Sequence, residues 1–384
     1  IMNPVKRLQE FGQSVYLDEI RRSWLLDGTL ARLIEDDGLH GVTSNPAIFA
    51  KAITGSKDYD PAIRAHAKAG DDVATAYEDI VVSDIQDAAD EFRAVFDRSG
   101  GRHGIVSLEV SPELADDAEG TISEGRHLWR RLDRPNVFIK VPATPAGLDA
   151  IRTLTRDGVN VNVTLLFGLE RYRQVIDAYL TGLEQRLEDG NDISGAISVA
   201  SFFLSRIDAL LDPRLDEIAA SGSSQARRAR ELRGEIAVAS AKVAYSIQQE
   251  AFGSEGSWSE RFAPLAALGA EPQRLLWAST GTKDPTYSDV KYVEALIGPD
   301  TINTLPFATL TAYRDHGQPA QRVTQGLQEA RAALADLKVL GIDLLEATDS
   351  LERDGVELFV KPYRDLLTAI EGSLNAGKAV AQGD

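Results

Sequence analysis

Eight short apolar segments recur along the chain, and each is followed by turn residues and then by a helical pattern. The segments lie near residues 14–17, 39–43, 104–110, 136–141, 159–165, 196–201, 274–278 and 301–305. The helical patterns between them include residues 19–35, 71–98, 113–132, 145–155 and 169–189. Strands that alternate with helices are typical of a parallel sheet with crossover helices, and eight strands close a TIM barrel. The pattern therefore predicts an α/β fold with a single (β/α)8 TIM barrel.

The chain is longer than such a barrel requires. A TIM barrel typically needs about 250 residues, and this chain has 384. The surplus falls between residues 46 and 104, in an insert over about 208–272 and in an extension over about 310–384, all predicted to be helical. None is large enough for a second core. We therefore expect one TIM-barrel domain over residues 1–384, with the barrel itself over about 14–309, extra helices and a C-terminal helical extension.

Lys140 interrupts one of the apolar segments, residues 137–142 with the sequence VFIKVP. Lysine is rarely buried, because burial removes the water that stabilises its ammonium group, and so it favours the neutral amine. A neutral amine is a nucleophile that forms Schiff bases with ketones and aldehydes. The alternative is a lysine whose ammonium group leaves through the strand end or pairs with a carboxylate.

Polar residues stand at the end of most of the other apolar segments, where the catalytic residues of TIM barrels are found. In chain order these are Asp18, Asn45, Glu109, Lys140, Asn162 with Thr164, Ser201 and Ser279. Strand ends also carry helix caps, and Asp18 and Asn45 are both placed to cap a following helix. Glu109 is different, because it interrupts its strand as Lys140 does.

Three of these residues supply the minimum for a Schiff-base aldol reaction. Such a reaction needs an amine, a carboxylate that takes the proton of the hydroxyl beyond the breaking bond, and a second acid/base that works through water. Lys140, Asp18 and Glu109 provide these groups. Thr164 is a candidate to hold the water, and Asn45 and Asn162 are candidates to bind substrate hydroxyls.

Two further pairs of residues suggest a phosphate clamp. Ser201 and Arg206 follow the sixth strand, and Ser279 and Lys283 follow the seventh. Two hydroxyls and two cations suit a phosphate group at this end of a barrel. The alternatives are a surface ion pair for Arg206 and a simple glycine-containing turn for residues 278–283.

The composition and net charge of the chain exclude several classes of binding partner and chemistry. A net charge of −18 offers no basic field for nucleic acid, and no apolar run approaches the roughly 18 residues that span a bilayer. The chain has no cysteine, which excludes disulfides and thiolate chemistry. We expect a cytoplasmic protein without a signal peptide. We expect no metal or other cofactor, because the five histidines are scattered: His40, His66, His103, His127 and His316.

Four motifs resemble those of transaldolases. They are residues 41–46 (GVTSNP), 137–144 (VFIKVPAT), 159–167 (VNVNVTLLF) and 201–206 (SFFLSR). The resemblance covers the barrel from about residue 14 to Lys283. It is to the longer bacterial subgroup, which is also found fused to phosphoglucose isomerase, although no isomerase domain is present in this chain.

The resemblance implies roles for the site residues. Lys140 would form the Schiff base with a dihydroxyacetone unit, Asp18 would be the acid/base for carbon–carbon cleavage, and Glu109 and Thr164 would work with a catalytic water. The resemblance also implies that Asn45 and Asn162 hold the dihydroxyacetone unit and that Ser201, Arg206 and the region of Ser279 bind phosphate. Many transaldolases carry an arginine where this chain has Gly281, so Lys283 is the nearest second cation.

The implied activity is transfer of dihydroxyacetone from sedoheptulose 7-phosphate to glyceraldehyde 3-phosphate, giving erythrose 4-phosphate and fructose 6-phosphate in the pentose phosphate pathway. One alternative is a fructose-6-phosphate aldolase, a lyase in which the position of Phe203 is typically tyrosine. Another is a barrel that binds sugar phosphates without catalysis. Sugar phosphates are the expected partners, and the chain is compatible with a monomer or a homodimer. A C-terminal helix within residues 354–374 is expected over the barrel mouth, either as a shield of the site or as a packing helix.

Overall fold

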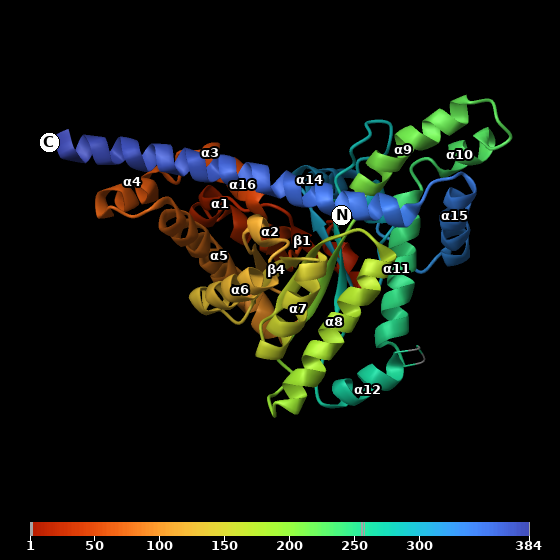
Figure 1. The fold of residues 1–384 in the computed structure, drawn as a ribbon, viewed down its shortest axis with the longest axis horizontal. Helices are drawn as coiled ribbons and strands as arrows, with labels where there is room; N and C mark the ends of the chain where they lie inside the picture. The colour runs from red at the N-terminus through yellow and green to blue at the C-terminus, as the bar shows by residue number, and fades with distance from the viewer. Residues whose placement is uncertain (1–2, 255, 257, 384) are drawn as a thin grey trace.

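Eight parallel strands close into a barrel in the computed structural model, which describes residues 3–254, 256 and 258–383 (Figure 1). The strands are β1 Gln13–Leu17, β2 Gly41–Thr43, β3 Ile105–Glu109, β4 Val137–Pro142, β5 Val161–Leu166, β6 Ser198–Phe203, β7 Arg274–Ala278 and β8 Thr301–Leu305. Their order around the barrel is their order in the chain, and β8 pairs with β1. The predicted (β/α)8 barrel is therefore confirmed.

Helices surround the barrel and extend it. They are α1 Arg22–Leu26, α2 Thr29–Asp37, α3 Pro46–Thr54, α4 Asp60–Ala69, α5 Val73–Arg98, α6 Ala118–Leu132, α7 Pro145–Asp157, α8 Leu169–Glu188, α9 Ser205–Ala220, α10 Ala226–Leu232, α11 Ile236–Phe252, α12 Ser259–Ala267, α13 Lys291–Glu294, α14 Phe307–His316, α15 Leu327–Val339 and α16 Leu344–Gly383, with 3-10 turns η1 Lys6–Phe11 and η2 Pro112–Leu114. No helix of the described ranges is both long enough and apolar enough to cross a membrane.

Several element bounds expected from the sequence were wrong, among them a helix break, the start of the helix expected over residues 113–132, which begins at Ala118, and a strand end. The single helix expected over residues 19–35 is two helices, α1 and α2, because Gly28 between them adopts a left-handed conformation with φ 73° that ends a helix. The sixth strand runs on to Phe203, since the apolar pattern continues past Ser201. Ser201 therefore lies inside β6 and not at its end.

The strand register places Glu109 and Lys140, the charged residues that interrupt apolar strands, at the same height in the barrel. Glu109 of β3 is paired with Lys140 of β4, and Lys140 is paired in turn with Asn162 of β5. Residues of neighbouring strands at one level point to the same side of a barrel wall. Three polar side chains of adjacent strands therefore point into the barrel together.

A polar cluster closes the barrel at the opposite end, where the strands begin. Arg274 Nη2 donates to Ser14 Oγ (2.6 Å), which lies 3.1 Å from His103 Nδ1. The rings of His40 and His103 stack with 4.0 Å between their centroids. Burial, with the nearby Arg274 guanidinium, lowers the pKa of His40 to about 4 and that of His103 to about 3. Both imidazoles are therefore neutral at physiological pH.

The long helix α16 crosses the other end of the molecule. Figure 1 shows it, in blue, running from the side of α9 and α15 to α3 and α4. It packs closely on β5, since a Cβ atom at Gly355 would lie 3.1 Å from Leu165 Cδ2. Arg171 of α8 forms an ion pair with Glu352 of α16, with 3.0 Å between Nε and Oε2. These contacts hold α16 over the carboxyl ends of the strands.

Candidate active site

A cavity of about 150 Å³ lies at the carboxyl ends of the strands, where the sequence predicted the site. Its lining residues are Asp18, Thr43, Asn45, Lys140, Thr164, Ser201, Phe203, Arg206, Ala278, Ser279, Gly281, Lys283, Thr304, Pro306 and Phe359. The two predicted site residues outside this lining, Glu109 and Asn162, contact members of it. The structure thus brings all of the predicted side chains to one place.

Lys140 is the buried amine of this cavity, with 4% of the residue exposed. Its Nζ donates to the carbonyl oxygen of Ser44 (3.0 Å) and lies 3.3 Å from Glu109 Oε2. Burial raises the pKa of Glu109, and the nearby Lys140 opposes this effect. A carboxyl group with a raised pKa, in contact with the amine, is suited to exchange protons with it.

Asp18 is the second carboxyl group of the cavity. Thr43 Oγ1 donates to Asp18 Oδ1 (2.7 Å) and lies 2.6 Å from Thr304 Oγ1. Because Thr43 uses its hydrogen on Asp18, Thr304 is the donor in the second contact. Desolvation raises the pKa of Asp18, while Lys140 and the hydrogen bond from Thr43 lower it less strongly. Asp18 does not cap a helix, so the capping alternative for this residue is wrong: the next helix, α1, begins only at Arg22.

Thr164 presents a buried hydroxyl without a hydrogen-bond partner in the described part of the chain. It lies where the β5–β6 register shifts between Val163 and Leu166, and the next residue, Leu165, has a φ of 52°. Such irregularities turn a side chain away from its regular direction and are common next to active sites. A buried orphan hydroxyl needs a partner such as water.

Asn162 and Asn45 are both partly engaged within the protein. Asn162 Nδ2 donates to Ser107 Oγ (3.0 Å), and Asn162 Oδ1 accepts from Ser201 Oγ (2.7 Å). Asn45 Oδ1 accepts from the amide of Ile48 (2.9 Å) and caps α3, so the helix-cap alternative is confirmed for this residue. Each amide group keeps N–H hydrogens that these bonds do not use.

Two cations face the cavity from the segments after β6 and β7. Arg206 lies in the first turn of α9, and burial lowers its pKa. Its Nη1 has no hydrogen-bond partner, and neither Arg206 nor Lys283 pairs with a carboxylate among the residues described. Ser279, in a left-handed conformation with φ 53°, lies beside them, with its Oγ 2.9 Å from Ser205 Oγ. Arg206 is partly buried and Lys283 is exposed. Cations without a carboxylate partner, next to hydroxyls and a helix N-terminus, are suited to an anion.

Aromatic side chains lie beside Arg206 and line the cavity. The Arg206 guanidinium carbon lies 5.9 Å from the centroid of the Phe203 ring, which itself packs on Phe167 with 5.1 Å between centroids. Phe359 of α16 lines the same cavity and is 3% exposed. The C-terminal helix thus contributes a side chain to the site. From the sequence, this helix could either shield the site or only pack on the barrel.

A buried ion pair anchors the segment that follows Asp18. Arg22 Nη2 lies 2.7 Å from Asp84 Oδ1 of α5, and Tyr59 Oη donates to Asp84 Oδ2 (2.8 Å). Asp84 is fully buried. The start of α1 is therefore fixed to α5, which holds the loop after β1 in place.

Sequence reasoning missed several residues of the site. Three of them contact predicted residues directly: Thr43 contacts Asp18, Ser44 contacts Lys140 and Ser107 contacts Asn162. Thr304 contacts Thr43, and Phe359 of α16 lines the cavity. Thr43 and Ser44 lie inside the GVTSNP motif, so a signal for them existed. In the described ranges no three histidine, aspartate or glutamate side chains gather as a metal site.

Known proteins resemble this chain over almost its whole length. The family described as Transaldolase/Fructose-6-phosphate aldolase matches residues 15–370. A protein named Transaldolase from Thiobacillus denitrificans is 47% identical over 96% of this chain and 100% of its own length. Transaldolase from Saccharopolyspora erythraea and Transaldolase 2 from a Nostoc species are each 44% identical, over 97% of this chain and 98% of theirs. The chain therefore belongs to the transaldolase/fructose-6-phosphate aldolase family.

Proposed function

We propose that this protein is a transaldolase, a transferase that moves a dihydroxyacetone unit from sedoheptulose 7-phosphate to glyceraldehyde 3-phosphate. The products are erythrose 4-phosphate and fructose 6-phosphate, as in the pentose phosphate pathway. The observation that carries the proposal is a buried lysine amine 3.3 Å from a carboxylate, in one cavity with a second carboxyl group and two unpaired cations. The names of the relatives agree with it.

Lys140 is the nucleophile in this proposal. Its neutral amine adds to the C2 carbonyl of the ketose, and the carbinolamine then loses water to give an iminium ion. Glu109 takes the amine proton and returns a proton to the departing hydroxyl through a water held by Thr164. The orphan hydroxyl of Thr164 and the contact of Glu109 with Lys140 support these roles.

Asp18 breaks the carbon–carbon bond. It removes the proton of the C4 hydroxyl, the C3–C4 bond breaks and an aldehyde leaves, while the iminium takes up the electron pair as an enamine. The acceptor aldehyde then enters and the steps run in reverse. The relay from Thr304 through Thr43 orients the carboxyl group for this work.

In this proposal, amide side chains and cationic side chains bind different parts of the substrate. The unused N–H groups of Asn45 and Asn162 bind hydroxyls of the dihydroxyacetone unit. Ser201, Arg206, Ser279 and Lys283 bind the phosphate. Gly281 has no side chain, and a Cβ there would lie 3.3 Å from Pro306 Cγ, so Lys283 supplies the second cation in this chain.

Trapping of the covalent adduct tests the proposal. Borohydride reduction with fructose 6-phosphate, followed by peptide mass mapping, should place a dihydroxyacetone-sized adduct on Lys140. Lys140→Ala should lose both adduct and turnover, whereas Lys361→Ala, which alters an exposed lysine of α16, should lose neither. Turnover should require erythrose 4-phosphate. Release of free dihydroxyacetone without an acceptor would instead indicate the aldolase activity of the same family.

Three further expectations belong to the proposal. The whole chain forms one domain, with the barrel over about 14–309 and helical additions packed on it. The protein works in the cytoplasm. An acidic surface with a net charge of −18 is compatible with a monomer or a homodimer, and sedimentation analysis decides between them.

A further inference from the structure

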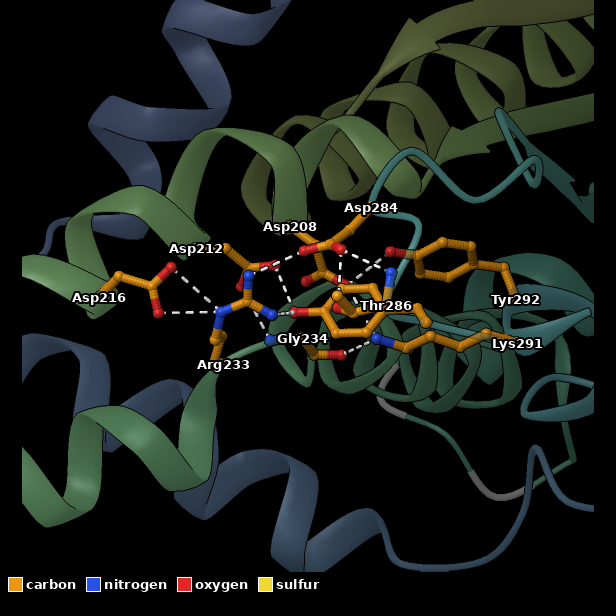
Figure 2. Close-up of polar contacts among 10 residues, drawn as sticks. Asp208, Asp212, Asp216, Arg233, Gly234, Asp284, Thr286, Lys291 and Tyr292 are labelled. Carbon is orange, nitrogen blue, oxygen red and sulfur yellow. Dashed lines mark hydrogen bonds and ion pairs between the residues drawn. The ribbon is translucent and has the colours of Figure 1, made fainter. Parts of the chain in front are cut away.

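Three aspartates on one face of α9 tie the helical insert to the loop that follows β7. Asp208, Asp212 and Asp216 are spaced by four residues and so lie on the same side of the helix. They face the junction of α10 and α11 at Arg233 and Gly234, and also the loop over residues 284–292 (Figure 2). Three separate chain segments therefore meet in one network.

Arg233 is the centre of this network. Its Nε lies 2.9 Å from Asp216 Oδ1, and its Nη2 lies 2.8 Å from Asp284 Oδ2. Its Nη1 donates to the hydroxyl of Tyr287, and its guanidinium carbon lies 5.2 Å from the centroid of that ring. The guanidinium thus bridges α9 to the loop after β7 through two carboxylates and a phenol.

The other two aspartates fix the same loop. Asp212 accepts from the amide of Gly234 (2.8 Å) and from the hydroxyl of Tyr287 (2.7 Å). Asp208 accepts from the hydroxyl of Tyr292 (2.8 Å) and lies 3.5 Å from Lys291 Nζ. The loop and the start of α13 are therefore bound to α9 at several points.

Both ends of the network adjoin the cations of the cavity. Arg206 precedes Asp208 by two residues in the first turn of α9, and Lys283 directly precedes Asp284. Asp284 also accepts from the amide (2.8 Å) and hydroxyl (2.7 Å) of Thr286, which makes a tight turn at this point. The backbone that carries Lys283 is thus fixed relative to the helix that carries Arg206.

We infer that Arg233 is a positioning residue, which holds Lys283 at the distance from Arg206 that the substrate phosphate requires. The inference rests on the proposed phosphate clamp. It gives the helical insert a part in substrate recognition. It also explains how a flexible lysine in a loop replaces an arginine at position 281.

Arg233→Ala tests this inference through the Michaelis constants for fructose 6-phosphate and for unphosphorylated fructose. We expect KM for fructose 6-phosphate to rise about tenfold, the value of one charge-assisted contact, with kcat little changed. The kinetics with fructose should stay within about twofold of the parent enzyme. Arg227→Ala, which changes an exposed arginine of α10 that pairs with Glu231, is the matched control and should change neither. Equal changes with both sugars would overturn the inference and leave Arg233 a structural residue.

A double-mutant cycle separates the positioning of Lys283 from a general loosening of the fold. If Arg233 acts through Lys283, Arg233→Ala should add nothing to the KM of Lys283→Ala. If the KM increases of the two single variants multiply in the double variant, the inference is overturned. Asp284→Asn removes the loop carboxylate that pairs with Arg233, so it should raise KM for fructose 6-phosphate as Arg233→Ala does. The test therefore remains available if Arg233→Ala does not fold. An unchanged KM in both Arg206→Ala and Lys283→Ala would instead overturn the phosphate clamp of the proposed function.

Discussion

Glu109→Gln isolates the proton transfer that the Schiff-base steps require. The substitution keeps the size of the side chain and removes its ionisable group 3.3 Å from Lys140 Nζ. Loss of one general acid–base usually lowers the rate about 10²–10⁴-fold, which corresponds to about 3–5 kcal/mol in the activation free energy. Since the side chains proposed to bind the phosphate and the hydroxyls are untouched, we expect kcat to fall at least 100-fold while KM changes less than about threefold.

The assay is single-turnover trapping of the Lys140 adduct with fructose 6-phosphate, measured beside steady-state turnover. Adduct formation should slow by the same factor as kcat. Glu119→Gln, which changes an exposed glutamate in the first turn of α6, is the control and should behave as the parent enzyme. Adduct formation at the parental rate in Glu109→Gln would refute the role given to this carboxylate.

Glu109→Gln should also change the stability of the folded protein, in a direction that follows from the pKa of Glu109. Burial raises the pKa of Glu109, so the unfolded chain releases this proton at a lower pH than the folded chain does. The favourable contribution of the protonated group is complete below the unfolded pKa and is lost as pH rises through the folded value. At neutral pH we therefore expect Glu109→Gln to unfold at the same temperature as the parent enzyme or a higher one, and a lower temperature would contradict this reasoning.

Substitutions at three other positions test other parts of the molecule. Arg22→Met leaves the fully buried Asp84 without its cation and should lower the free energy of unfolding by about 3–5 kcal/mol in denaturant titrations, whereas Arg22→Lys should cost less. The depressed pKa values of His40 and His103, about 4 and about 3, predict that stability falls as pH drops from about 6.5 towards 3, and His103→Asn should flatten that slope in thermal melts. Phe359→Leu should open the cavity and increase release of dihydroxyacetone measured without an acceptor, and an unchanged release would show that this ring only packs.

The positions of the strands and of the main site residues follow from local sequence. Apolar runs with β-branched residues define strands, and a charged residue that interrupts one, such as Lys140 or Glu109, points to the barrel interior. The pairing of these two residues depends on the strand register, which the sequence motifs alone do not specify. The break at Gly28 was missed, because a glycine inside a helical pattern is often tolerated.

The rest of the site depends on contacts between distant segments. Thr304 reaches Asp18 only through Thr43, and Phe359 reaches the cavity from a helix far along the chain. No spacing in the sequence encodes these contacts. Asn162 was assigned to substrate from its strand position, and only the structure shows that Ser107 and Ser201 already occupy part of its amide.

The position of α16 across the barrel mouth has a consequence for the newly made chain. At about 5–20 residues per second, the roughly 80 residues between Leu305 and Gly383 take about 4–16 s to add. All eight strands have been synthesised before this helix is complete. A barrel that closes before α16 is added carries Lys140 uncovered for seconds, and small aldehydes in solution have access to it during that time.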